Sequence, residues 1–106
     1  MGFYYNMLSF FSVIKNGVPK SDDLELLSMK LPGAAWKHLA RSLKFDEAEI
    51  TAFDSENQEL REKAYKMLLK WKAKRGFELA TYRVLYHALC DERVGQTELA
   101  ERFCYC

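Results

Sequence analysis

The segment from Leu60 to Gly76, LREKAYKMLLKWKAKRG, constrains the fold of this chain more than any other stretch. On a helix, five of its apolar residues fall at i, i+4, i+7, i+8 and i+11, which places them on one stripe. These residues are Leu60, Ala64, Met67, Leu68 and Trp71. The stripe predicts a central helix packed in a core, and Gly76 stands where a left-handed C-terminal stop is expected.

Charge is segregated along the chain, although the net charge of the 106 residues is only +1. The segment 46–58 carries five acidic side chains and no Lys or Arg, whereas 59–75 carries seven basic side chains against two acidic ones. Four of these lysines, Lys63, Lys66, Lys70 and Lys74, flank the apolar stripe on one side. This separation predicts complementary surfaces, but a solvated helix face explains the lysines equally well.

The length predicts one domain, which can bury a sizeable core without a disulfide or a metal ion. The three cysteines, Cys90, Cys104 and Cys106, cannot all pair within the chain. They favour reduced thiols and a cytoplasmic location, or the cytoplasmic part of a receptor if the chain is an excised domain. The apolar run 3–14 is too short for a transmembrane helix and lacks the flanks of a secretory signal.

Residues 1–20 are expected to form an N-terminal hydrophobic extension and a linker. The periodicity of the extension fits a strand as well as a helix, and we favour a short helix ending near Asn16-Gly17. Val18-Pro19-Lys20 then has the composition of a linker. The compact domain is expected over 21–103, followed by a tail of three residues at 104–106.

Local signals place five further helices around the central one. Ser21-Asp22-Asp23 can cap a helix that runs to Leu31, and Ala34–Lys44 has the apolar spacing of a second. Asp46 and Glu49 have the spacing of a capping box, which opens a third helix of two turns that ends before 54–57. Thr81 can cap a fifth helix.

A last short helix spans the apolar residues Leu99 to Phe103, and strand signals are nearly absent. Short connections then predict an all-α, six-helix antiparallel bundle, with an extra N-terminal helix as an option. The residues expected in the core are Leu27, Trp36, Leu39, Leu43, Ile50, Leu60, Met67, Leu68, Trp71, Leu85, Leu89 and Leu99.

The order and spacing of these patterns resemble the death domain family over about Ser21 to Phe103. The resemblance rests on a tryptophan in both the second and the fourth helix, Trp36 and Trp71, and on an ordered set of segments. These segments are GAAWKHLARSLKF, DEAEI, LREKAYKMLLKWKAKRG, ATYRVLYHAL and LAERF. They are more similar to death domains of adaptors, tumour-necrosis-type receptors and receptor-interacting kinases than to caspase-recruitment, death-effector or pyrin modules.

The resemblance implies a non-enzymatic module without a cofactor or small-molecule substrate, which recruits other death domains into oligomeric complexes of apoptosis or innate immune signalling. It implies asymmetric contacts, the commonest joining helices two and three of one molecule to helices one and four of the next. Such head-to-tail contacts can propagate. The residues expected to bind a partner are Asp46, Glu47, Glu49, Asp54, Glu56, Lys63, Lys66, Leu69, Lys70, Lys74, Lys37 and Arg41.

Leu69 points away from the core stripe and is expected to form an apolar outer face with Tyr65. Either the apolar run 3–14 covers this face, which we favour, or a partner does. His87 and Cys90 lie at i and i+3, but two ligands alone do not make a metal site. The terminal Cys-Tyr-Cys lacks the pattern of the common prenylation box, so ordinary thiols are expected there.

Two other functions remain open at this point. The basic fourth helix could bind the phosphates of a nucleic acid, although the near-neutral chain and the acidic segment 46–56 argue against it. A purely structural bundle would have no partner at all. No pairing of a nucleophile with a base and no glycine-rich phosphate loop suggests an enzyme.

Overall fold

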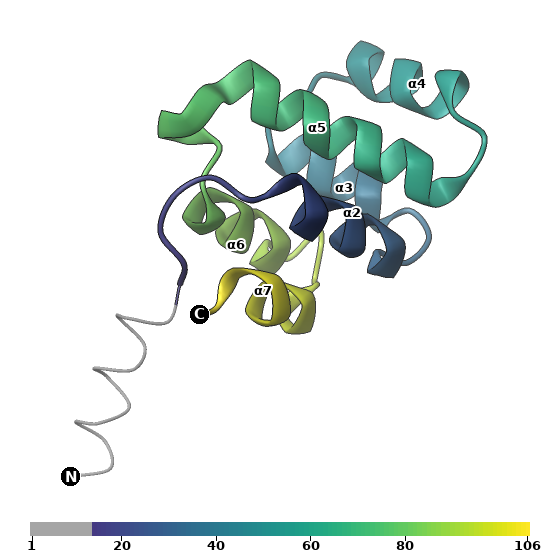
Figure 1. Ribbon diagram of the computed structural model, residues 1–106. Coiled ribbons are helices and arrows are strands. Elements are labelled where there is room, and N and C mark those ends of the chain that lie inside the picture. The colour runs from purple at the N-terminus through teal and green to yellow at the C-terminus, as the bar shows by residue number, and fades with distance from the viewer. Residues whose placement is uncertain (1–13) are drawn as a thin grey trace, which may run out of the picture.

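The computed structural model describes residues 14–106, which form six α-helices (Figure 1). The predicted all-α, six-helix architecture is confirmed, and the described residues contain one isolated antiparallel bridge, between Ile14 and Tyr105. The helices are α2 (Ser21–Lys30), α3 (Ala35–Ser42), α4 (Glu47–Glu56), α5 (Leu60–Leu79), α6 (Tyr82–Cys90) and α7 (Thr97–Cys104).

Helix α5 is the centre of the bundle, as its apolar stripe predicts. It packs against α2, α3 and α4, while α6 packs against α7 and α3. Figure 1 shows α4 on one side of α5 and the pair α6 and α7 on the other. Met67 and Leu68 are fully buried and Trp71 is 1% exposed, so the middle turns of α5 form the surface against which α2, α3 and α4 pack.

Most residues expected in the core are buried, with two exceptions. Leu60 is 41% exposed, so its assignment to the core is wrong. Leu60 is the first residue of α5, and at this end of the helix the neighbouring elements of the described chain leave its side chain exposed. Leu99 is only partly buried at the edge of the core. The buried residues are Leu27, Trp36, Leu39, Leu43, Ile50, Met67, Leu68, Trp71, Leu85 and Leu89.

Helix α4 is longer than the two turns expected, because it continues through Asp54 and Ser55 to Glu56. The hydroxyl of Ser55 donates to the carbonyl of Ala52 over 3.3 Å, which is compatible with a helix. Asn57 donates from Nδ2 to the carbonyl of Phe53 over 3.0 Å and satisfies an acceptor at the end of α4. Asp54 and Ser55 are therefore part of the last turn of α4, and Asn57 caps its C-terminal end.

The capping box at the start of α4 is present. The Glu49 N–H donates to Asp46 Oδ1 over 2.8 Å, and the Asp46 N–H donates to Glu49 Oε1 over 3.0 Å. Thr81 Oγ1 accepts from the Val84 N–H over 3.2 Å, as expected at the start of α6. The expected cap of α2 is wrong, since Ser21 already lies within the helix and the N-cap residue is Lys20, without a side-chain cap.

Gly76 has the positive φ expected of a stop, at 74°, but the helical region does not end there. The chain kinks at Gly76 and makes one more turn to Leu79, in which the Ala80 N–H donates to the Gly76 carbonyl over 2.8 Å. A side chain at this φ would be strained, so glycine suits the kink. The extra turn carries α5 beyond the edge of the core.

The segment 14–20, expected as a linker, packs against the bundle. Pro19 is fully buried. The Lys15 N–H donates to the Cys104 carbonyl over 2.7 Å, and the Tyr82 N–H donates to the Gly17 carbonyl over 2.9 Å. The packed unit therefore begins before Ser21. The remainder of the expected N-terminal helix, residues 1–13, lies outside the described residues.

Candidate interaction surface

Two ion pairs fasten α4 to α5, one near each end of their contact. Lys63 Nζ donates to both the carboxylate and the backbone carbonyl of Asp54, the latter over 2.8 Å. Lys74 Nζ lies 2.9 Å from Glu49 Oε2. Hydrogen bonds from Lys63 and then Lys37 lower the pKa of Asp54. These bonds hold the acidic helix in a fixed position beside the basic one.

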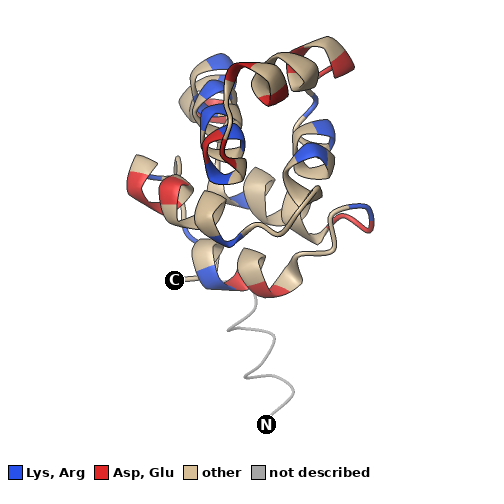
Figure 2. Cartoon of the chain, turned by 90° about the vertical axis from the view of Figure 1, so that its right-hand side faces the viewer, with Lys and Arg blue, Asp and Glu red and all other residues tan. Residues whose placement is uncertain are grey.

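Ion pairs also join α3 to α4. Arg41 donates from Nε and Nη2 to the two oxygens of Glu47, over 2.8 and 3.0 Å, in the forked geometry that guanidinium groups favour. The hydrogen bond from Arg41 lowers the pKa of Glu47. Lys37 Nζ lies 3.1 Å from the second carboxylate oxygen of Asp54. In Figure 2 the ribbon of α4, red at its acidic residues, lies next to the blue stretches of α5 and α3.

Part of the expected charge separation is therefore neutralised within the molecule. Among the acidic residues, Glu47, Glu49 and Asp54 form ion pairs, whereas the Asp46 carboxylate accepts a backbone N–H in the capping box and has no cationic partner among the described residues. Glu56 is exposed and makes no ion pair within the described residues. The surface available to a partner is consequently smaller than the sequence predicts.

Two of the four flanking lysines keep their charge facing outwards. Lys66 and Lys70 are exposed, and neither forms an ion pair with another described residue. They lie in the middle of α5, between the paired residues Lys63 and Lys74. The pKa of Glu49 is lowered mainly by the Asp46 N–H and by Lys74, with a smaller contribution from the charge of Lys70. Lys66 and Lys70 therefore form the cationic centre of this surface.

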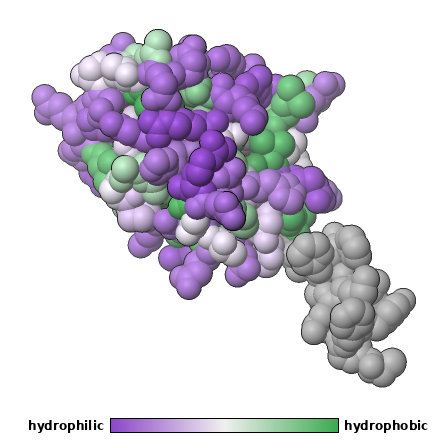
Figure 3. Space-filling model, turned by 180° about the vertical axis from the view of Figure 1, so that it is seen from behind, coloured by the Kyte–Doolittle hydropathy of each residue, from purple (hydrophilic) through white to green (hydrophobic). Residues whose placement is uncertain are grey.

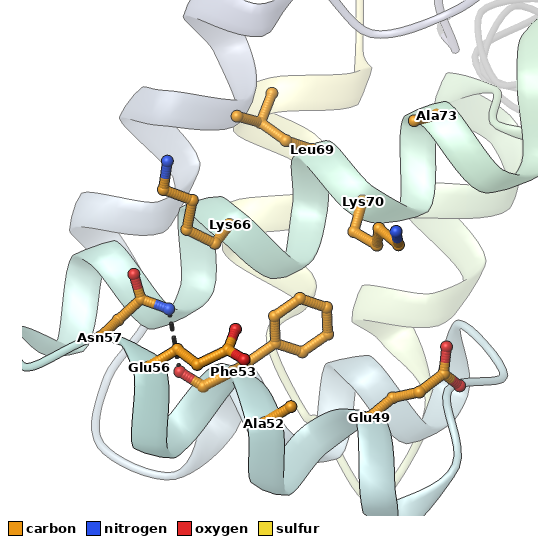
Figure 4. A pocket seen from close by; sticks show the side chains of 9 residues that line it. All are labelled: Glu49, Ala52, Phe53, Glu56, Asn57, Lys66, Leu69, Lys70 and Ala73. Atoms are coloured by element: carbon orange, nitrogen blue, oxygen red, sulfur yellow. Dashed lines mark hydrogen bonds between the residues drawn. The ribbon is translucent and has the colours of Figure 1, made fainter.

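A groove of about 660 Å³ runs between α4 and α5 beside these lysines (Figure 4). We call it the α4–α5 groove. Glu49 and Glu56 come from α4 and Lys66 and Lys70 from α5, while the ring of Phe53 points from α4 towards α5. The two walls therefore carry opposite charge over an apolar base. The lining residues are Glu49, Ala52, Phe53, Glu56, Asn57, Lys66, Leu69, Lys70 and Ala73.

Leu69 and Tyr65 do not share one surface in the way expected. Leu69 is partly buried and lines the α4–α5 groove. Tyr65 packs partly against the core and lines a separate hollow of about 150 Å³ with Met29 and Arg61. Cover of Leu69 by residues 3–13 lies outside the described part of the chain. The one described residue of that run, Ile14, pairs with Tyr105 instead.

Several partly or largely exposed apolar residues have no counterpart in the sequence-based prediction. Phe53 in the groove could have been noticed, because it lies three residues after Ile50 on the same helix. Phe77 and Leu79, on the turn after Gly76, and Val84, near the start of α6, are exposed around the α5–α6 connection. No periodic signal predicts that turn.

Residues 14–106 contain two histidines and three cysteines, whose imidazole and thiol groups are common metal ligands. They contain no group of three or more His, Cys, Asp or Glu side chains that could hold a metal ion. His87 is exposed, and Cys90 is partly buried against the core. Burial raises the pKa of the Cys104 thiol to about 12. None of the helices over these residues is both long enough and apolar enough to cross a bilayer.

Comparison with known proteins gives one family match. The model of the family described as Death domain matches residues 21–103, which include all six helices except the last residue of α7. No significant match was found among curated proteins or among solved structures.

Proposed function

Since the chain belongs to the death domain family, whose members are protein–protein interaction modules, we propose that it recruits other death domains into oligomeric signalling complexes of apoptosis or innate immunity. Members of the family act without catalysis, and we extend this to the present chain. The proposed partners are copies of this chain or other death-domain proteins. A cytoplasmic location, free or as part of a receptor, belongs to the same proposal.

The observation that carries the proposal is the outward position of Lys66 and Lys70 on α5. Lys63 and Lys74 are engaged in holding α4, whereas Lys66 and Lys70 remain open to an acidic partner. Asp46 and Glu56, at the two ends of α4, lack an ion pair among the described residues and would face the basic surface of a neighbour. Charge complementarity of this kind speeds association and selects orientation.

The proposed contact is asymmetric. One face contains Lys66, Lys70 and Leu69 of α5 together with neighbouring α2. The acidic face contains Asp46 and Glu56 of the α4 region, and it borders the first face along the α4–α5 groove, which Glu56 lines together with Lys66 and Lys70. The side chains of Lys37, Arg41, Glu47, Glu49 and Asp54 are held in place beside it by their ion pairs. Unlike faces that meet head to tail leave one free face at each end, so the assembly can grow.

Neutralising variants of the two faces test this proposal. Lys66→Gln/Lys70→Gln removes the basic face, and Asp46→Asn/Glu56→Gln removes the acidic one while asparagine retains the N-cap. Each variant alone should stay monomeric in light scattering under conditions where the wild-type chain assembles. An equimolar mixture should form dimers that grow no further, because each variant keeps one intact face.

Lys20→Gln/Arg102→Gln is the matched control, since both side chains are exposed cations without an ion pair among residues 14–106. It should assemble as the wild type does. A wild-type chain that stays monomeric at high concentration and captures no death-domain protein from a cell lysate would refute the proposal. A gel shift with mixed-sequence duplex DNA, abolished by Lys66→Gln/Lys70→Gln, would favour nucleic-acid binding instead.

A further inference from the structure

The connection between α5 and α6 presents a cluster of apolar side chains to solvent. Phe77 is 79% exposed, Leu79 is 58% exposed and Val84 is 41% exposed. We call these three residues the apolar corner. In Figure 3, seen from behind, hydrophobic surface gathers at the upper right edge, where the C-terminal end of α5 lies.

Two of the three residues, Phe77 and Leu79, lie on the turn that follows the kink at Gly76, where the φ of 74° redirects the end of α5. Phe77 and Leu79 therefore lie on a turn at the end of the helix and project outwards, although both belong to the longest helix of the described fold. Large apolar side chains gathered on an exposed, projecting turn indicate a binding surface.

The surroundings of the apolar corner are basic. Lys44 and Arg75 line a hollow of about 230 Å³ together with Leu79 and Val84, and Arg83 is exposed directly before Val84. None of these three cations forms an ion pair within the described residues. Between positions 72 and 84 the sole acidic residue is Glu78. The corner thus combines projecting apolar groups with an excess of positive charge.

We propose that the apolar corner binds the surface of membranes that contain anionic lipids. Phenylalanine and leucine side chains insert at the boundary between headgroups and acyl chains, and nearby lysines and arginines attract anionic headgroups. Phe77 and Leu79 supply the first component, and Lys44, Arg75 and Arg83 supply the second. A neutral membrane provides only the first component, so it binds more weakly.

The projection of the side chains favours a lipid surface over a protein partner. A protein would have to supply a matching cavity for Phe77, whereas a bilayer accepts a projecting side chain of any shape. The corner also lies beyond Gly76, whereas Lys66 and Lys70 lie in the middle of α5. A chain bound to a membrane in this way keeps the α4–α5 groove available to another molecule.

Sedimentation with vesicles tests the proposal on the full chain. The probes are vesicles of phosphatidylcholine alone and vesicles in which about one third of the lipid is phosphatidylserine. The wild-type chain should bind the second kind, and added salt should weaken the binding. Both Phe77→Ser/Leu79→Ser and Arg75→Gln/Arg83→Gln should reduce the affinity by about tenfold.

Leu26→Ser/Met29→Ser is the matched control, because these residues are 49% and 51% exposed on α2, away from the corner. It should bind as the wild type does. All variants retain residues 1–20, so any binding through the apolar N-terminal run is common to them. Absence of binding to phosphatidylserine vesicles, or equal binding by Phe77→Ser/Leu79→Ser, would overturn the proposal. Loss of self-association in that variant without any vesicle binding would assign the corner to a protein contact.

Discussion

Lys63 of α5 donates from one ammonium group to both the side chain and the backbone carbonyl of Asp54, which lies on α4 nine residues earlier. The lysine side chain is 19% exposed and the Asp54 side chain is 39% exposed, so this contact is partly shielded from solvent. A second lysine, Lys37 of α3, approaches the same carboxylate. Asp54 therefore joins three helices.

Removal of this lysine should loosen α4. We expect Lys63→Met to lower the melting temperature by about 3–6 °C, because a partly buried acceptor on Asp54 loses its donor. Lys66→Met, about one turn further along α5 on its exposed side, should leave the melting temperature unchanged. Circular dichroism during thermal unfolding measures both values. Equal melting temperatures for the two variants would show that Lys63 does not hold α4.

Acid should destabilise the fold over a defined range of pH. Hydrogen bonds and charges lower the pKa values of Glu49 and Asp54 from 4.5 and 3.8, and Arg93 lowers the pKa of Asp91 to about 2. Below pH 4.5 the unfolded chain therefore binds more protons than the folded one, and stability falls as the pH decreases towards 2. In Asp91→Asn the loss between pH 4 and 2 should be smaller. Urea unfolding across this range provides the measurement.

Leu60 and Leu68 should respond differently to the same truncation, although both are leucines of α5. Leu60 is 41% exposed, so we expect Leu60→Ala to cost less than about 1 kcal/mol. Leu68 is fully buried, and Leu68→Ala should cost about 2–5 kcal/mol because it leaves a cavity. Chemical denaturation of the two variants compares these costs. A large loss for Leu60→Ala would mean that its side chain is covered in solution.

Tyr82 should be required for packing of the segment 14–20. Its hydroxyl donates to Asp23 over 2.7 Å and accepts from the Lys20 N–H over 3.3 Å. We expect Tyr82→Phe to cost about 1–2 kcal/mol, since the partly buried partners lose their hydrogen bonds. Tyr65→Phe is the control, because the Tyr65 hydroxyl makes no hydrogen bond among the described residues. Equal stability of the two variants in denaturant would contradict this role.

The same hydroxyl should make stability sensitive to alkali. Burial, and then the hydrogen bond to Asp23, raise the pKa of Tyr82 above its usual value of 10. The unfolded chain therefore releases this proton above pH 10 while the folded chain still holds it, so the free energy of unfolding falls as the pH rises from 10 towards the pKa of the folded state. Urea unfolding above pH 9 should show a smaller loss in Tyr82→Phe than in the wild type. An identical dependence on pH would exclude this contribution.

Much of the fold could be predicted from local signals. The apolar stripe of α5 predicted the central helix, and the Asp46 and Glu49 spacing predicted the start of α4, because helical period and capping depend on residues within one or two turns. Leu60 was misassigned because the period alone does not tell where along a helix the neighbours begin. The turn after Gly76 was missed because a positive φ at a glycine does not specify the conformation of the residues beyond it.

The candidate interaction surface was less predictable. The sequence separated acidic from basic residues, but it did not indicate that Glu49 would meet Lys74, 25 residues away, or that Asp54 would meet Lys37. In the sequence the four lysines of α5 appear equivalent. The ion pairs engage Lys63 and Lys74 and leave Lys66 and Lys70 exposed. The residues of the α4–α5 groove come from two helices, so their grouping could not be recognised in either one.

The sequence by itself determined the helices, several of their caps and most of the buried stripe, because these depend on interactions between residues a few positions apart. Tertiary structure alone decided which charges are paired inside the molecule and which face a partner, because an ion pair depends on distance in space. Lys63 and Lys66 are separated by about one turn of the same helix. Lys63 forms an ion pair with Asp54 because α4 lies beside it, whereas Lys66 forms no ion pair with any described residue and stays exposed.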